Sequence, residues 1–284
     1  MKIVFFGSSK YSTIVENALY NNFGLSLVVT LPDRPTGRNK KLTPNPVKIF
    51  TTENNIPLIT AEKLDKLIAE QIKKVEPDFL VVTDYGLILP REFLSLPKYA
   101  PLNVHHSLLP KYRGPSPATT AILNGEKISG VTVIKMNEKV DAGNILSQKE
   151  YELKPDETTN SLLTKLNTLG GEIIISAIED FIKGGLKLVK QDESKASYTK
   201  ILEKKDGFVD IDNPPSSEKI DRMIRAFYPW PGVWTKWKME NGKWKIIKLL
   251  PGQKIQVEGK NPMNHKDFLN GYPRGKSILE KLNL

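Results

Sequence analysis

The chain has 284 residues, 39% of them hydrophobic, which is enough for one large domain followed by a smaller one. It has no cysteine and three histidines, which excludes disulfides and cysteine-ligated metal centres and argues against a histidine-rich site, so no metal is expected. The net charge of +10 is confined to residues 33–48 and 201–284, which favours a polyanionic partner over a merely lysine-rich surface.

The amino terminus carries no predicted targeting signal. Residues 1–6 are apolar too briefly for a signal peptide, and Gly7 follows them at once. No apolar run approaches the ~20 residues that a membrane helix needs. We therefore expect a cytoplasmic protein, and nothing in the sequence requires more than a monomer.

Short apolar runs alternate with helical patterns in the first part of the chain. Strands are predicted at 2–6, 25–30, 56–59, 79–83 and 102–106, and helices at 12–21 and 61–75. This alternation predicts an α/β, Rossmann-like fold with a mostly parallel sheet, whose ligands bind at the carboxyl ends of the strands. No Gly-x-Gly-x-x-Gly or Walker-type loop occurs, so neither a dinucleotide nor ATP is indicated.

The last third of the chain has a different character. Two further strands, 131–136 and 145–150, and a long helix, 157–181, precede a rise in charged and aromatic residues from about residue 196. A helix at 217–227 and three β-rich segments, 233–239, 244–250 and 254–258, then follow. We expect a catalytic domain at 1–202 and a small β-rich domain at 203–284.

The polar residues at the end of the fifth predicted strand are the strongest candidates for catalysis. Asn103 and His105 project from one face of this strand, because side chains alternate along it. An amide donor beside an imidazole suits a reaction that builds an oxyanion. Asp141 follows another strand and could orient the imidazole. The alternative is that Asn103 and His105 only satisfy local backbone groups.

A family resemblance strengthens the catalytic interpretation. Residues 103–110 read NVHHSLLP and residues 141–143 read DAG. They resemble the folate-dependent formyltransferases, whose signature is Asn-x-His-x-Ser-Leu-Leu-Pro with a later Asp-x-Gly. The family acts on several amines, including glycinamide ribonucleotide, sugar nucleotides and aminoacyl-tRNA.

Other segments are similar to the methionyl-tRNA formyltransferases within this superfamily. Residues 31–48 resemble their basic insertion loop, 85–90 the loop bordering their folate pocket, and 225–232 the start of their C-terminal domain. Residues 259–263 and 268–273 resemble its end, so the resemblance extends from Met1 to about Gly275. The C-terminal domain of that family is an OB-like barrel, and this one is shorter by roughly two strands.

The resemblance implies an activity and a set of site residues. The enzyme would transfer the formyl group of 10-formyltetrahydrofolate to the α-amine of methionyl-initiator tRNA, giving formylmethionyl-tRNA for translation initiation. Asn103 and His105 would hold the developing oxyanion, and Asp141 would orient His105 and relay the proton. The implied folate-binding residues are Tyr85, Gly86, Leu87, Ile88, Ser107, Leu108, Leu109 and Pro110. The implied tRNA-binding residues are Arg34, Arg38, Lys40 and Lys41.

Two positions depart from the family pattern. His106 stands where a small residue or proline is usual, and we expect it to face away from the reaction. Asp84 stands where alanine is usual and changes the polarity near the folate loop. In the C-terminal domain, four tryptophans lie among basic residues, and they either stack on RNA or form the core.

Three alternatives share part of this pattern. A formyltransferase acting on a small amine, such as an amino-sugar nucleotide, would keep the catalytic residues but not need residues 33–48. A formyltetrahydrofolate hydrolase would use water in place of an amine. A non-catalytic tRNA-binding protein would have no need for Asn103, His105 and Asp141 together.

Overall fold

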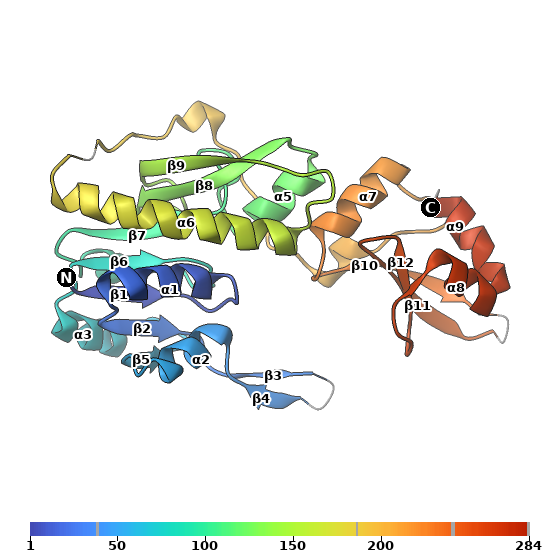
Figure 1. Ribbon diagram of the computed structural model, residues 1–284, viewed down its shortest axis with the longest axis horizontal. Coiled ribbons are helices and arrows are strands. Elements are labelled where there is room, and N and C mark those ends of the chain that lie inside the picture. Colours follow the sequence, from blue (N-terminus) through green and yellow to red (C-terminus); the bar gives the residue numbers. More distant parts are fainter. Residues whose placement is uncertain (38–39, 186, 240–241, 283–284) are drawn as a thin grey trace. The chain divides into compact units, whose positions relative to one another are not determined.

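The computed structural model describes residues 1–37, 40–185, 187–239 and 242–282 (Figure 1). These residues form two compact units. The first comprises Met1–Pro115, Ile128–Glu152 and Leu163–Tyr198, and the second comprises Ser116–Lys127, Leu153–Leu162 and Thr199–Leu284. The division of the chain into domains 1–202 and 203–284 stays a prediction.

The first unit contains a seven-stranded sheet with the order β5-β2-β1-β6-β7-β8-β9. The first five of these strands pair in parallel, and β8 and β9 continue the sheet antiparallel. The predicted α/β fold with a mostly parallel sheet is therefore confirmed. The strands are β1 (Ile3–Phe6), β2 (Leu27–Thr30), β5 (Leu58–Thr60), β6 (Phe79–Val82), β7 (Ala100–His105), β8 (Ile128–Lys135) and β9 (Asn144–Glu152).

Helices cover both faces of this sheet, because alternate side chains of its buried strands point to opposite sides. The helices are α1 (Ser12–Phe23), α2 (Pro46–Glu53), α3 (Lys66–Val75), α4 (Arg91–Leu94) and α6 (Thr159–Ile182). One core cluster joins α1, α2 and α6 to one face, and a second joins α3 and α4 to the other. Gly170 lets α6 approach the sheet closely, since a Cβ there would lie 2.6 Å from Val104.

A two-stranded hairpin lies between β2 and α2 in the basic loop. Its strands are β3 (Arg34–Thr36) and β4 (Lys41–Thr43), and the hydroxyls of Thr36 and Thr43 are 2.6 Å apart. This hairpin was not predicted from the Pro- and Gly-rich sequence. At the base of the hairpin, Lys48 and Asp33 form a 2.7 Å ion pair.

The second unit contains a small antiparallel sheet, as predicted. Its order is β10-β11-β12-β13, and β13 has only two residues. The strands and helices are β10 (Val233–Lys238), β11 (Trp244–Leu250), β12 (Lys254–Val257), β13 (Met263–Asn264), α5 (Pro117–Leu123), α7 (Ser217–Ala226), α8 (His265–Gly271) and α9 (Lys276–Leu282). Short 3-10 helices lie at Glu193–Lys195 in the first unit and at Lys204–Gly207 and Pro273–Gly275 in the second. No pairing of the described residues closes β10 onto β13, so the sheet is open.

Several helix bounds differ from the predictions for local reasons. The helix predicted at 61–75 begins at Lys66, because the Asp65 carboxylate caps it by accepting the Ile68 N–H. Helices α5, α8 and α9 were not predicted, since each has only seven residues and shows little periodicity. Within the described ranges, no helix is long and apolar enough to cross a membrane.

Glu16 of α1 is fully buried, and its burial should make the protein less stable as the pH rises. Its carboxyl accepts the Thr51 hydroxyl at 2.7 Å, and burial raises its pKa from 4.5 to about 8. An unfolded Glu16 ionises above its ordinary pKa, whereas the folded one keeps its proton, so the free energy of unfolding falls as pH rises from about 4.5 to 8.

Glu16→Gln should remove this fall in stability. Between about pH 5 and 8 we expect the wild type to lose on the order of 4 kcal/mol more of its free energy of unfolding than the variant. Denaturant unfolding of both proteins at the two pH values measures the difference. The exposed Glu53→Gln is the control, and equal pH slopes for wild type and Glu16→Gln would refute the assignment.

Candidate active site

The end of β7 brings the three predicted catalytic residues together. The Asn103 amide donates to Asp141 Oδ1 at 3.2 Å, and His105 Nδ1 lies 3.6 Å from Asp141 Oδ2. His105 is 6% exposed and Asp141 14%, so the imidazole and the carboxylate face each other largely out of water. Their mutual electrostatic effect is therefore stronger than it would be at the surface.

Asp141 is held in place by its backbone and by a second donor. It adopts a left-handed conformation with φ 51°, and its Oδ2 accepts the Gly114 N–H at 2.7 Å. The neighbouring Gly143 cannot carry a side chain, because a Cβ there would lie 1.9 Å from the Lys135 carbonyl oxygen. The Asp-Ala-Gly sequence thus fits one tight turn that aims the carboxylate at β7.

The tautomer of His105 follows from its other contact. Its Nε2 lies 2.9 Å from the Tyr112 carbonyl oxygen, which can only accept, so Nε2 carries a proton. Nδ1 is then the ring nitrogen that faces the Asp141 carboxylate. The 3.6 Å separation between Nδ1 and the carboxylate exceeds an ordinary hydrogen bond and leaves this nitrogen able to interact with a substrate atom.

Two residues that sequence reasoning missed support the Asp141 turn. Gln191 donates to the carbonyl oxygens of Asp141 and Gly143, both at 2.7 Å. Arg113, 1% exposed, donates to Gln191 Oε1 at 2.8 Å and forms a two-bond ion pair with Glu193 at 2.8 and 2.9 Å. Arg113 lies three residues after the end of the 103–110 motif, and a polar Gln191 in a short irregular segment gives no signal of its own.

Asp84 and His106, the two departures from the family pattern, lie against each other. Asp84 Oδ1 is 3.4 Å from His106 Nδ1, and Asp84 Oδ2 accepts the Ser9 hydroxyl at 3.0 Å. His106 is 4% exposed, and burial lowers its pKa while Asp84 opposes that shift. Its neighbour on the far side is Asn167 of α6, so His106 lies across β7 from the Asn103–Asp141 contact.

This contact predicts non-additive effects on stability. Asp84→Ala leaves the buried His106 without this contact, and His106→Ala leaves the half-buried Asp84 without it; each loss costs about 1–3 kcal/mol in the free energy of unfolding. The double variant should be more stable than the sum of the single losses implies, by about 1 kcal/mol or more. Denaturant unfolding of the four proteins measures this coupling. His106→Ala with the exposed Glu62→Ala is the control, and additive losses for Asp84 and His106 would contradict the pairing.

The predicted folate residues occupy two loops next to this cluster. Tyr85 and Gly86 follow Asp84 directly, and Ser107–Pro110 follow His106, so the Asp84–His106 contact brings the two loops together. The Tyr85 hydroxyl is buried without a hydrogen-bond partner among the described residues, and burial raises its pKa to about 12. Ile88 is 77% exposed. The loop therefore presents an apolar side chain at the surface through Ile88, while Tyr85 belongs to the core beneath it.

The other folate candidates are ordered by backbone contacts. Leu109 N–H donates to Thr132 Oγ1 at 3.2 Å, and its carbonyl accepts Gln148 at 2.8 Å. The Ser107 hydroxyl donates to the Lys111 carbonyl at 2.6 Å. Leu108 packs on Gly130, where a Cβ would lie 2.4 Å from its side chain. These contacts fix the shape of the segment that leads away from His105.

The predicted tRNA-binding residues lie on the β3–β4 hairpin and not on the strand end. Arg34 and Lys41 are exposed in β3 and β4, and exposed Lys40 has φ 46° in the connecting turn. Arg38 lies outside the described residues. The hairpin therefore presents at least three positive side chains to solvent.

Family models and solved structures agree with this architecture. The model described as "Formyl transferase" matches residues 1–178, and "Formyl transferase, C-terminal domain" matches residues 201–254. Among solved structures, a 4-N formyltransferase from Francisella tularensis is 18% identical with a TM-score of 0.67, covering 88% of this chain and 97% of its own. The sugar 3N-formyl transferase WlaRD is 21% identical with a TM-score of 0.61, covering 92% and 99%. At these identities the likeness concerns the fold.

Curated relatives are closer. A methionyl-tRNA formyltransferase from Clostridium novyi is 36% identical over 95% of this chain and 97% of its own length. A methionyl-tRNA formyltransferase from Clostridium tetani is 38% identical over 98% and 99%. The fold, the two matching models and these relatives show that the chain belongs to the methionyl-tRNA formyltransferase family.

Proposed function

We propose that this protein transfers the formyl group of 10-formyltetrahydrofolate to the α-amine of methionyl-initiator tRNA in the cytoplasm. The observation that carries the proposal is the buried contact of Asn103, His105 and Asp141 at the carboxyl end of β7. Relatives that match nearly the full chain are named methionyl-tRNA formyltransferase, which favours this acceptor over a small amine.

The residues at the strand end suit each part of the transfer. The amine replaces the folate nitrogen at the formyl carbon, and the carbonyl oxygen carries negative charge in between. Asn103 uses one amide N–H for Asp141, so its second N–H can donate to that oxygen. A proton on His105 Nδ1 supplies a second donor, and the Asp141 carboxylate stabilises the resulting imidazolium. The proton lost by the amine would pass to Asp141 and from there to the departing folate nitrogen, so that the folate leaves as a neutral amine.

The two ordered loops next to this cluster would hold the folate. The apolar members of these loops that are at least partly exposed are Leu87, Ile88, Leu108 and Pro110. Gly86, at φ +90°, allows the backbone of the first loop to turn without a side chain. Ser107 follows His105 by two residues, so a folate held by these loops would lie next to the strand end.

The β3–β4 hairpin would contact the tRNA backbone. Lysine ammonium groups bind phosphates as point charges, so Lys40 and Lys41 would meet phosphates. Arg34 and Arg38 would be further contacts to the tRNA. Lys40→Ala with Lys41→Ala is expected to raise KM for methionyl-tRNA roughly tenfold with little change in kcat, and to lower the slope of log affinity against log salt by about 2. Kinetics and binding at several salt concentrations measure both. The exposed Lys63→Ala and Lys66→Ala form the control pair, and an equal effect of the two pairs would contradict a phosphate contact.

Competing acceptors test the proposal. The protein is incubated with 10-formyltetrahydrofolate and, separately, with methionyl-initiator tRNA, an amino-sugar nucleotide, or buffer alone. The proposal predicts rapid formylation of the tRNA and little folate turnover in the other two reactions. Faster formylation of the amino-sugar nucleotide would show that the protein acts on small amines. Folate turnover in buffer alone would show that it hydrolyses 10-formyltetrahydrofolate.

A further inference from the structure

Asp84 and His106 join the ends of three neighbouring parallel strands. Ser9 follows β1, Asp84 follows β6 and His106 follows β7, and these strands lie side by side in the sheet (Figure 1). The Ser9 hydroxyl donates to Asp84 Oδ2 at 3.0 Å, and Asp84 Oδ1 lies 3.4 Å from His106 Nδ1. Because ligands of such a sheet bind at the carboxyl ends of its strands, this contact lies in the part of the fold where a reaction would take place.

The Asp84–His106 contact holds the last part of β7 after the backbone pairing with β6 has ended. The last residue of β7 in register with β6 is Asn103. The side-chain contact then ties the chain to the end of β6 again, directly after His105. On this side of the strand, the position of His105 therefore depends on a contact between side chains as well as on the backbone ladder.

His105 and His106 point to opposite faces of the strand end, since side chains alternate along it. His105 faces the site, with Nε2 2.9 Å from the Tyr112 carbonyl oxygen and Nδ1 3.6 Å from Asp141 Oδ2. His106 is 4% exposed and interacts with Asn167 of α6 on the other face. A rotation of the strand end that released His106 would therefore turn His105 away from both of its partners.

The surroundings of His106 make its contact with Asp84 costly to lose. Nε2 of the ring is buried and has no hydrogen-bond partner in the part of the chain that the structure describes. Burial lowers the pKa of His106, and the carboxylates of Asp84 and Asp141 oppose this shift. Without Asp84, the buried ring would have no acceptor at Nδ1 and would have to turn to find one.

We propose that Asp84 and His106 act together as positioning residues for formyl transfer, by fixing the end of β7 behind His105. They do not touch the reacting atoms, because His106 is buried on the far face of the strand and Asp84 contacts it there. The inference rests on the proposed function, since formyl transfer is the reaction that His105 would support. A pair that only stabilised the fold would change stability and leave kcat unchanged in folded variants.

Kinetics of the full chain with 10-formyltetrahydrofolate and methionyl-initiator tRNA test this role. Asp84→Ala and His106→Ala should each lower kcat about tenfold with little change in either KM, because a small misplacement of a reacting group slows the chemical step without weakening binding. The double variant leaves no polar partner unpaired and should recover to within about threefold of wild type. His106→Asn, whose amide can still donate to Asp84, should also stay within about threefold.

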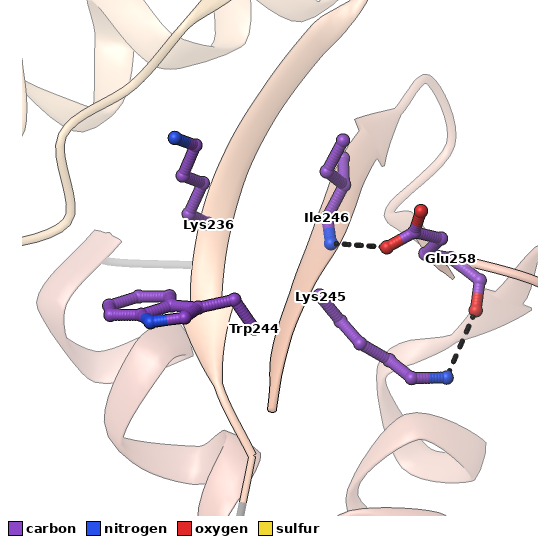
Figure 2. Close-up of a pocket in the computed structure, with 5 residues that line it drawn as sticks. All are labelled: Lys236, Trp244, Lys245, Ile246 and Glu258. Atoms are coloured by element: carbon purple, nitrogen blue, oxygen red, sulfur yellow. Dashed lines mark hydrogen bonds between the residues drawn. The ribbon is translucent and has the colours of Figure 1, made fainter. Parts of the chain in front are cut away.

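The control for these variants is Glu258→Gln in the second unit. Glu258 lies beside a hollow of about 480 Å³, and its carboxylate accepts the Ile246 N–H at 3.2 Å (Figure 2). The variant removes a charged acceptor, as Asp84→Ala does, and should keep the wild-type kcat. Thermal unfolding shows whether each variant is folded. If Asp84→Ala is not, Asp84→Asn takes its place and should lower kcat by at least about threefold.

NMR spectroscopy of the histidine rings observes the positioning without an activity assay. The chain has three histidines, so selective ¹⁵N labelling gives few signals, and replacing His106 or His265 assigns them. In wild type and His106→Asn, the Nε2–H of His105 should exchange slowly with water, because it is buried against the Tyr112 carbonyl oxygen. In Asp84→Ala the exchange should be faster by about tenfold or more.

Folded single variants with the wild-type kcat, or with a lower kcat and an unchanged His105 signal, would overturn the proposal. So would a double variant as slow as the product of the two single effects, because residues that act as a pair do not give additive losses. A His105 signal that depends on Asp84, in a protein that does not formylate tRNA, would support the positioning role and refute the proposed function. Formylation with a His105 signal that is independent of Asp84 would do the reverse.

Discussion

Replacing Asn103 with alanine is expected to lower kcat for formyl transfer by roughly 10²–10³-fold, with little change in KM. The amide is placed at the strand end by the two-residue period of β7 and is oriented by its 3.2 Å contact with Asp141. In the proposed mechanism the amide donates to the formyl oxygen only when that oxygen carries charge, so its loss should raise the barrier and leave ground-state binding almost unchanged. Steady-state kinetics with saturating folate and varied methionyl-tRNA measure both constants.

The control for this prediction is Asn144→Ala, at an exposed position in β9. It should match wild type in both constants. A tenfold or smaller loss of kcat in Asn103→Ala would show that Asn103 only supports Asp141, because the oxyanion would then be held by other groups.

Asp141→Asn is expected to lower kcat by about 10²–10⁴-fold, the range that positioned acid–base groups contribute. The substitution nearly preserves volume but removes the negative charge that stabilises an imidazolium at His105. It also places an amide where Asn103 and Gly114 now donate to a carboxylate, so one donor loses its acceptor. Single-turnover formylation measures the chemical step without product release.

The matched variant is Asp192→Asn in the same unit, where the exposed carboxylate accepts from Ser194. It should leave the single-turnover rate unchanged. Unfolding experiments must show that Asp141→Asn is folded. A folded Asp141→Asn protein with nearly wild-type rate would mean that the proton leaves by another route.

The sequence predicted the central geometry because strand alternation is a local rule. Asn103 and His105 lie two residues apart on a buried strand, and the structure brings both to Asp141. The sequence separation between the motif and Asp141 did not predict their contact. The antiparallel register of β8 on β7 and the tight turn at Gly143 supply it.

Contacts between residues far apart in sequence were not predictable. The departures at Asp84 and His106 were noted separately, and only the pairing of β6 with β7 makes them one contact. Gln191 and Arg113 lie 78 positions apart in the sequence and are joined by a 2.8 Å hydrogen bond between side chains, which no periodic pattern indicates. The β3–β4 hairpin was missed because its strands have three residues each. Arg38, one of the four implied tRNA-binding residues, lies outside the described residues.

In the C-terminal sheet, the sequence pattern predicted the strands but not the positions of the tryptophan side chains. Three strands were predicted from β-rich segments and are present, because alternation of Val, Trp and Lys marks an inner and an outer face. The tryptophans could not be assigned to core or surface from composition alone. Register decides it, with Trp237 inside and Trp244 outside.

Single-turnover transfer of labelled formyl from 10-formyltetrahydrofolate to methionyl-initiator tRNA tests the central claim most directly, with wild type and Asn103→Ala compared in parallel. The account predicts rapid formylmethionyl-tRNA formation by wild type and a rate roughly 10²–10³-fold lower in the variant. No formylmethionyl-tRNA from folded wild type, or equal rates in the two proteins, would contradict it.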